Sequence, residues 1–192
     1  PQNEWTGKPG VGRASMAAAA REAAFFGAPT PSATRKVAMR AGHIMANDPP
    51  SLFRKLRDLA AHGAGGTAGN ANHRVSWMHA DDFLRAIDFT IQQPFLSGII
   101  NCAAPHHPTR KSLMALFRET VGMPIGLPLK HWGINTPWIT PTRLMDEGFS
   151  WRWPHPADAI ADLEQRLGLD GFFRKPTPRC AGARVWLPAA SR

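Results

Sequence analysis

The sequence has no tyrosine, only two cysteines and no long apolar run. Without tyrosine, the chain has no phenol that could donate or accept a proton in catalysis. Cys102 and Cys180 lack metal-ligand spacing and lie far apart, so they argue against a disulfide framework and indicate a reducing, cytoplasmic setting. No uninterrupted apolar stretch approaches the ~20 residues that cross a bilayer, and the sequence therefore indicates no membrane partner.

Acidic residues are absent after Asp170, where five basic residues follow: Arg174, Lys175, Arg179, Arg184 and Arg192. These residues supply more than half of the net charge of +9. A tail rich in proline, arginine and alanine is typically solvated or irregular. Because no nucleic-acid-reading motif accompanies it, the positive charge does not by itself indicate a nucleic-acid partner. We predict that residues 171–192 form a basic, irregular tail.

The composition is typical of a globular protein, with 43% hydrophobic residues in a chain of 192. Helices are predicted over residues 15–26, 52–61, 81–93, 109–121 and 156–167, and strands over 36–41, 73–79, 98–104, 125–129 and 149–153. This alternation argues for an α/β fold with a mainly parallel sheet. Only the strands at 36–41 and 98–104 have the composition of a buried core. Two strands make a poor sheet, so the chain resembles part of a larger α/β unit.

The central stretch, residues 74–86, has the pattern of a short strand, a corner and an amphipathic helix. Asp81 and Asp82 fall in the first turn of that helix, where its dipole favours negative charge. His79 and the two aspartates are of metal-ligand type, but we interpret all three as capping groups and predict no metal site. The apolar residues that recur at helical spacing are Phe83, Leu84, Ile87 and Ile91.

The segment Gly63-Ala64-Gly65-Gly66 is rich in glycine, as phosphate-binding loops are. Such a loop should follow a strand and open a helix. Here the segment follows a predicted helix and leads toward a predicted strand. We therefore interpret it as a flexible connection.

Six short motifs occur in a fixed order along the chain. They are RKVAMR at 35–40, the glycine pair at 65–66, SWMHADD at 76–82, GIINCAAP at 98–105, RLMDEGF at 143–149 and WP at 153–154. This succession resembles the extended, epimerase-like branch of the short-chain dehydrogenase/reductase superfamily. Within that branch it resembles the sugar-nucleotide-epimerase-related subfamily, which carries a small C-terminal domain of uncharacterised function. The resemblance covers residues 4–167.

The resemblance implies an NAD(P)-binding Rossmann domain followed by a smaller substrate lobe. In the family, the glycine-rich cofactor fingerprint would precede the first residue of this sequence. We therefore expect an α/β fold with the C-terminal half of a Rossmann-like parallel sheet and a small α/β extension. On this interpretation residues 1–122 belong to the Rossmann-like domain, residues 123–170 form the small lobe and residues 171–192 form the tail.

The resemblance also implies binding residues. Ala41 and Gly42, at the end of the strand at 36–41, would offer backbone contacts to NAD or NADP, and His43 would face the substrate. Arg74 lies one place from the position where epimerases carry an arginine that binds the substrate diphosphate, a contact that suits a guanidinium. The alternatives are an exposed histidine at a strand end and an ordinary surface arginine.

The predicted helix at 15–26 occupies the region where the wider superfamily has its Tyr-x-x-x-Lys pair. In that pair the phenol is the acid and base, and the lysine lowers its pKa. This helix has Arg21 and Glu22 as its only charged pair. We therefore predict no catalytic residue in the chain.

The family implies an NAD(P)-dependent epimerase or oxidoreductase that exchanges hydride at a carbonyl or carbinol carbon, with a sugar nucleotide as candidate substrate. The 192 residues alone are predicted to be catalytically silent. An alternative is a non-catalytic interaction module that joins a partner, or a copy of itself as a homo-oligomer, through an exposed sheet edge and the Trp-rich segment at 130–141. A third hypothesis is nucleic-acid binding through the basic tail.

Overall fold

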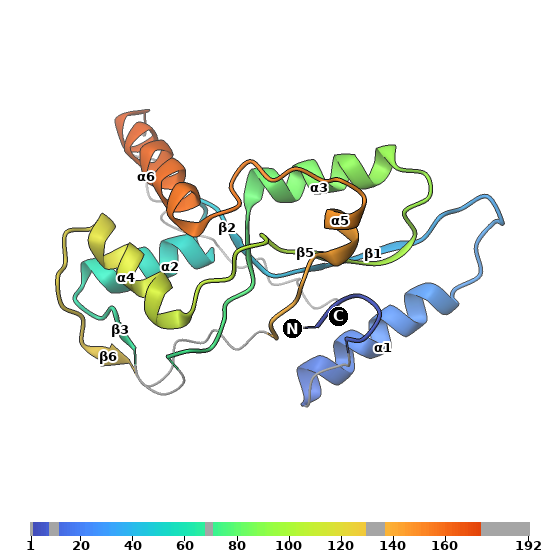
Figure 1. The fold of residues 1–192 in the computed structure, drawn as a ribbon, viewed down its shortest axis with the longest axis horizontal. Coiled ribbons are helices and arrows are strands. Elements are labelled where there is room, and N and C mark those ends of the chain that lie inside the picture. The colour runs from blue at the N-terminus through green and yellow to red at the C-terminus, as the bar shows by residue number, and fades with distance from the viewer. Residues whose placement is uncertain (1, 8–11, 68–70, 130–136, 174–192) are drawn as a thin grey trace, which may run out of the picture.

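The structure, a computed structural model, describes residues 2–7, 12–67, 71–129 and 137–173 (Figure 1). All of the predicted basic tail except its first three residues lies outside this range. Within the described part of the chain, no helix has the length and apolar character needed to span a membrane.

The strands pair in parallel, as predicted. β1 (Val37–Ala41) pairs with β5 (Gly98–Cys102) along its whole length. The chain then passes through Gly42 into β2 (His43–Met45), which pairs with β4 (Trp77–His79). A further pair joins β3 (Gly66–Thr67) to β6 (Pro128–Leu129). The predicted fold class is confirmed: the structure is α/β, with short parallel sheets of a partial Rossmann-like kind.

Six helices connect and cover these strands in the described part of the chain. They are α1 (Arg13–Gly27), α2 (Leu52–Ala61), α3 (Ala80–Gln92), α4 (Arg110–Thr120), α5 (Thr142–Asp146) and α6 (Pro156–Phe173). Ser51 and Thr109 cap α2 and α4, because each side-chain oxygen accepts a hydrogen bond from a backbone N–H of the first turn. α1 lies apart from the other helices, alongside the N-terminal segment (Figure 1).

Two apolar cores hold the elements together. The first lies between α2, α4 and α6, and its largest fully buried side chains are Trp77, Phe53 and Phe117. The second lies between α3, the β1–β5 pair and α5, and contains Ile100, Leu144 and Phe149. The predicted division at residue 122 stays a prediction, although α4 and α6, which lie on either side of that residue, share the first core.

The outer edge of β5 is covered by side chains from distant parts of the chain. The Glu4 carboxylate accepts a hydrogen bond from the backbone N–H of Asn101 at 3.0 Å. The Arg143 guanidinium donates to the carbonyls of Ser97 and Ile99 at 2.5 and 2.8 Å. These contacts satisfy backbone groups that an open strand edge would leave to solvent or to another chain.

Three local expectations were wrong. The segment at 149–153 is not a strand, because the backbone N–H groups of Arg152 and Trp153 donate to the Asp82 carboxylate instead of to a neighbouring strand. The helix predicted to end at residue 167 continues, as α6, to Phe173. On α3, Leu84 and Ile91 are 60% and 66% exposed, whereas the buried row is Asp82, Ala86 and Thr90. The hydrophobic periodicity was therefore wrong for Leu84 and Ile91, although Phe83 packs against the second core.

The predicted flexible connection at 63–66 is in fact tightly packed. Gly66 opens β3, and a Cβ atom at this position would lie 2.3 Å from the Gly126 carbonyl oxygen. Leu127 donates to the Gly63 carbonyl at 2.7 Å. Only glycine fits at position 66, because two backbone segments approach closely here. The segment therefore belongs to the β3–β6 strand pair and is not a flexible connection.

Asp82 is a buried carboxylate that joins α3 to the C-terminal segment. It accepts hydrogen bonds from the backbone N–H groups of Arg152 and Trp153, both at 2.9 Å, and from the Arg85 guanidinium at 2.8 Å. The prediction that both aspartates cap α3 was wrong for Asp82. The N-cap of α3 is His79, as predicted, whose Nδ1 accepts from the Asp81 N–H at 3.1 Å.

Asp82→Ala should destabilise the fold by about 3 kcal/mol, because it leaves two backbone N–H groups near the core without an acceptor. The matched control is Asp88→Ala, which removes an exposed carboxylate from the same helix. Urea unfolding of the two variants and the parent measures the difference. An Asp82→Ala variant as stable as Asp88→Ala would contradict the role of this carboxylate.

His79 is fully buried and stacks on Trp153, with ring centroids 3.9 Å apart. Its Nε2 lies 3.2 Å from an Asp162 carboxylate oxygen. Burial lowers the pKa of His79, although the nearby Asp81 and Asp162 act in the opposite direction. The folded state therefore favours the neutral ring, which keeps Nδ1 free to accept the capping hydrogen bond.

Because the pKa of His79 is lower in the folded chain, the unfolded chain should bind more protons at pH values between the folded and the ordinary histidine pKa. The free energy of unfolding should therefore decrease as the pH falls through this range. His79→Gln should reduce the loss of unfolding free energy between about pH 7.5 and pH 5.5 by about 1 kcal/mol. His62→Gln, at an exposed position, is the control and should keep the parent's pH dependence. Equal pH dependence in both variants would overturn this assignment.

Candidate functional site

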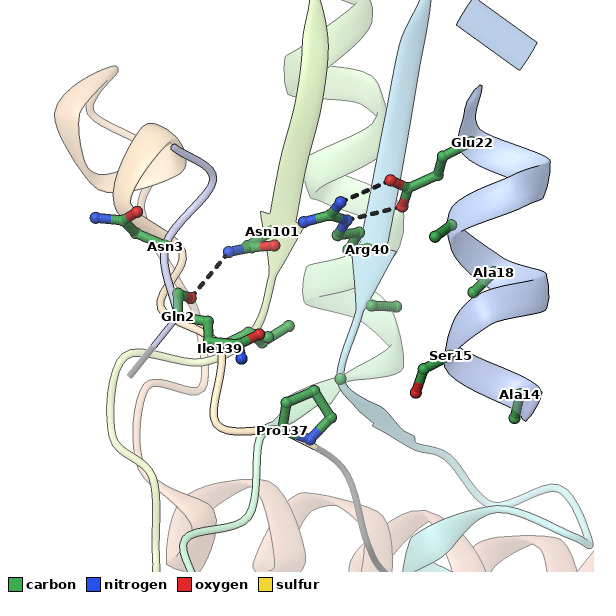
Figure 2. Close-up of a pocket in the computed structure, with 13 residues that line it drawn as sticks. Gln2, Asn3, Ala14, Ser15, Ala18, Glu22, Arg40, Asn101, Pro137 and Ile139 are labelled. Carbon is green, nitrogen blue, oxygen red and sulfur yellow. Dashed lines mark hydrogen bonds and ion pairs between the residues drawn. The ribbon is translucent and has the colours of Figure 1, made fainter. Parts of the chain in front are cut away.

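A pocket of about 330 Å³ lies between α1 and the C-terminal end of β1 (Figure 2). Small side chains on one face of α1 form one wall, and the ends of β1 and β5 form the other. The N-terminal segment and the stretch at 137–139 close the remaining sides. The lining residues are Gln2, Asn3, Ala14, Ser15, Ala18, Ala19, Glu22, Arg40, Ala41, Gly42, Asn101, Pro137 and Ile139.

Arg40 and Glu22 join the two walls of the pocket. The guanidinium donates two parallel hydrogen bonds to the carboxylate, from Nε at 2.7 Å and from Nη2 at 2.6 Å. α1 contains no buried residue, so this ion pair is a main attachment of the helix to the sheet. The Lys36 ammonium adds a second attachment, donating to the carbonyls of Phe26 and Ala28 at the end of the helix.

The ion pair shifts the pKa values of both of its members. The hydrogen bonds from Arg40 lower the pKa of Glu22 despite its partial burial. The same hydrogen bonds raise the pKa of Arg40. Both groups are therefore charged at neutral pH, and among the described lining residues no other side chain is acidic or basic. The pocket walls offer fixed charge and hydrogen bonds rather than a group that exchanges protons near neutrality.

Asn101 lies next to Arg40 across the β1–β5 pair. Its side chain is buried, and its Nδ2 donates to the carbonyls of Gln2 and Thr140 at 3.3 and 3.0 Å. Its Oδ1 is buried and has no hydrogen-bond partner among the described residues. Asn101 therefore brings an unused acceptor to the wall of the pocket.

Ala41 and Gly42, the predicted cofactor contacts, both line this pocket. Gly42 also lies at the point where the chain passes from one strand pair to the other. A Cβ atom on Gly42 would lie 2.7 Å from the Ser76 carbonyl oxygen, so only glycine fits between the two backbones. The structure places these two residues together at the predicted strand end, and their cofactor role stays a prediction.

His43 and Arg74, the predicted substrate contacts, do not line the pocket. His43 lies on β2 near Lys55 of α2, and burial lowers the pKa of its imidazole. Arg74 donates to the His107 carbonyl at 2.8 Å and lies over the Trp138 ring, 5.2 Å from its centroid. The structure thus does not bring either residue into the pocket that Ala41 and Gly42 line, and their substrate role stays a prediction.

Sequence reasoning did not single out Arg40, Glu22 or Asn101 as site residues. Glu22 is the only acidic residue of α1, and Arg40 interrupts an apolar strand, so each was a visible exception to its surroundings. Their pairing over 18 positions depends on how α1 packs, which the local pattern does not specify. Asn101 stands in a buried strand, where a polar side chain calls for a partner. Within the described residues, no cluster of three or more His, Cys, Asp or Glu side chains could hold a metal ion.

No family model matches the chain. In sequence it is similar to an epimerase family protein of Mycobacterium bovis, with 32% identity over 98 residues, which is 51% of this chain and 32% of the relative. It is also similar to an epimerase family protein of Staphylococcus epidermidis, with 28% identity over 146 residues, 68% of this chain and 47% of the relative. The matches therefore span about a third to a half of the length of these relatives.

Two solved structures share the fold at low sequence identity. A human epimerase family protein crystallised with NADPH gives a TM-score of 0.73 at 18% identity, over 85% of this chain and 59% of that one. The UDP-glucose 4-epimerase of Thermus thermophilus, in complex with NAD, gives 0.55 at 15% identity, over 81% and 52% of the two chains. These comparisons confirm the predicted resemblance: over the part that matches, the chain is similar in sequence to epimerase family proteins and shares the partial Rossmann-like fold of the two solved structures.

Proposed function

We propose that the pocket between α1 and β1 is the nicotinamide end of an NAD(P) site in an epimerase or oxidoreductase of this kind. The observation that supports the proposal most directly is the position of Ala41 and Gly42. These residues were expected to contact the cofactor from the sequence, and they line the same pocket as the unpartnered Asn101 Oδ1. Ligand sites at the carboxyl ends of parallel strands are the rule in α/β folds.

The described residues fit the nicotinamide end of the cofactor. Ala14, Ala18 and Ala19 leave room on the helix side of the pocket for a flat ring, and Ala41 and Gly42 present backbone on the sheet side. NAD(P), when bound, supplies the hydride-accepting or hydride-donating carbon of the reaction. The glycine-rich segment at 63–66 is engaged with β6 and does not offer a phosphate-binding loop. The proposal therefore concerns the ring and its substituents.

Among the described lining residues, the pocket has no acidic or basic side chain whose charge changes near neutral pH and that could transfer a proton. Glu22 and Arg40 keep their charges through neutral pH, for the reasons given above, and the sequence has no tyrosine. An epimerase or oxidoreductase that acts on a carbinol must remove a proton from the hydroxyl as hydride leaves. We therefore propose that the 192 residues bind the nicotinamide end of the cofactor but do not turn it over.

A sugar nucleotide is the substrate class that we propose for the complete activity, because one neighbouring structure is a UDP-glucose 4-epimerase. A cytoplasmic location and the division into a Rossmann-like part and a small lobe remain proposals of the same kind. The interaction-module alternative also stays a prediction.

The pocket is tested by filling it from the helix side. Ala18→Trp should weaken NADH or NADPH binding at least about tenfold, because the indole would occupy the space of the ring. Ala17→Trp is the matched control, since Ala17 is exposed on the same helix and does not line the pocket. Fluorescence titration measures binding, and an absorbance assay at 340 nm measures turnover. Equal affinity in the two variants, or no saturable binding by the parent, would reject the site, and turnover by the parent would reject the silent assignment.

The attachment of α1 is tested by hydrogen exchange. Glu22→Gln should speed amide exchange within α1 about fivefold at neutral pH, which corresponds to about 1 kcal/mol for a partly exposed ion pair. Because the pKa of Glu22 is lowered in the fold, its contribution is present above the ordinary carboxyl pKa and is lost as the pH falls through the folded value. The effect of Glu22→Gln should therefore disappear in acid. Arg21→Gln, at an exposed position, is the control, and exchange rates that do not separate the two variants would count against the ion pair.

A further inference from the structure

The orientation of the Asn101 carboxamide is determined by its surroundings. Nδ2 faces two carbonyl oxygens, those of Gln2 and Thr140, and a carbonyl accepts a hydrogen bond but cannot donate one. The opposite orientation would place oxygen against oxygen at both positions. Oδ1 therefore lies on the side away from Gln2, where it is buried and has no partner among the described residues. A buried acceptor in this condition is rare and costs stability.

The unused acceptor faces the side of the pocket where Arg40 lies. Arg40 and Asn101 are directly paired in the β1–β5 register, so their side chains leave the sheet on the same face. Figure 2 shows the Asn101 oxygen turned toward the Arg40 guanidinium, with α1 beyond Arg40. Glu22 occupies Nε and Nη2 of Arg40, and Nη1 has no hydrogen bond to any described group. An acceptor and a donor therefore adjoin the same space.

The charges of the pocket decide which kind of group fits there. Glu22 already neutralises Arg40, and its carboxylate would repel an anion. A phosphate or carboxylate ligand, when ionised, has no proton to donate to Asn101 Oδ1. A neutral hydroxyl or primary carboxamide can donate one hydrogen bond and accept another. Such a group can donate to Asn101 Oδ1 and accept from Arg40 Nη1 at the same time.

We propose that Asn101 and Arg40 form a recognition site for one neutral group that donates to Asn101 Oδ1 and accepts from Arg40. Two ligands offer such a group, the carboxamide of a nicotinamide and a hydroxyl of a sugar. The inference rests on the proposed function, because it concerns the same pocket. It goes further because it names Asn101 as the acceptor and Arg40 as the donor. Both act as positioning residues and take no part in proton transfer.

The test is a nuclear magnetic resonance titration of the full 192-residue chain labelled with ¹⁵N. The reporters are the Asn101 side-chain amide and the Arg40 Nε–H. The probes are NADH, the reduced 3-acetylpyridine analogue of NADH, in which a methyl ketone replaces the carboxamide, and UDP-glucose. The analogue keeps the acceptor and loses the donor, so it removes only the hydrogen bond to Oδ1.

For a carboxamide ligand, NADH should shift both reporters saturably, and the analogue should bind about three- to tenfold more weakly because one hydrogen bond is lost. For a sugar hydroxyl, UDP-glucose should shift both reporters and NADH should not. If NADH binds by fluorescence but no probe moves the reporters, the recognition site is wrong while the proposed cofactor pocket stands. If UDP-glucose alone binds and moves them, the site stands and the cofactor pocket fails. If no probe binds, both fail.

A variant gives an independent readout. Asn101→Leu removes Oδ1 and should lower the affinity for the probe that shifts the reporters about tenfold, while the affinity for the analogue that lacks the donor stays nearly unchanged. The variant also loses the hydrogen bonds from Nδ2, so its near-ultraviolet circular dichroism must match that of the parent. If it does not fold, the comparison of NADH with its analogue decides the question on the parent chain.

Discussion

The structure depends on one close approach between two backbones, at Gly42. Its N–H donates to the Cys102 carbonyl at 3.0 Å, and the N–H of the next residue, His43, donates to the Ser76 carbonyl at 2.8 Å. The strand that begins at Val37 thus changes its partner within one residue, from β5 to β4. A side chain at position 42 would collide with Ser76, so the change of partner requires glycine.

This change of partner sets the positions of both cores and of the pocket. Before Gly42 the strand packs against α3 and α5 in the second core, and after it Met45 enters the first core with α2. Arg40 and Ala41 come just before the change, where the sheet side of the pocket is formed. The Asp82 carboxylate reinforces the arrangement at a distance, because it fixes the C-terminal segment to the start of α3. The pocket is therefore built on the part of the fold where packing and backbone hydrogen bonding are most constrained.

The sequence predicts the positions of the helices and strands better than it predicts which face of each is buried. The parallel strands, the starts of α2 and α4 and the glycine end of β1 follow from local pattern, and the structure confirms the elements. The exposure of Leu84 and Ile91 on α3 was missed because the buried row contains Asp82 and Thr90, whose polar groups are satisfied by hydrogen bonds that periodicity does not reveal. Gly66 was interpreted as a loop residue because the close contact with Gly126 joins segments 60 residues apart in sequence.

The candidate site shows the same limit. Ala41 and Gly42 were accessible to sequence reasoning because a family pattern marks the end of their strand. Glu22, Arg40 and Asn101 were not, because each acquires its role from another element: the carboxylate from α1, the guanidinium from β1 and the amide from β5. Long-range pairing of polar groups is a property of the packed structure, and a single sequence contains little information about it.

The two walls of the pocket differ in chemistry, and this difference bears on what the chain can do. The helix wall has alanines at 14, 18 and 19, a single serine and the Glu22 carboxylate. The sheet wall keeps polar groups, in Arg40 and Asn101, that can hold a ligand without exchanging protons with it. The described walls of the pocket therefore present charges and hydrogen-bonding groups that are fixed near neutral pH.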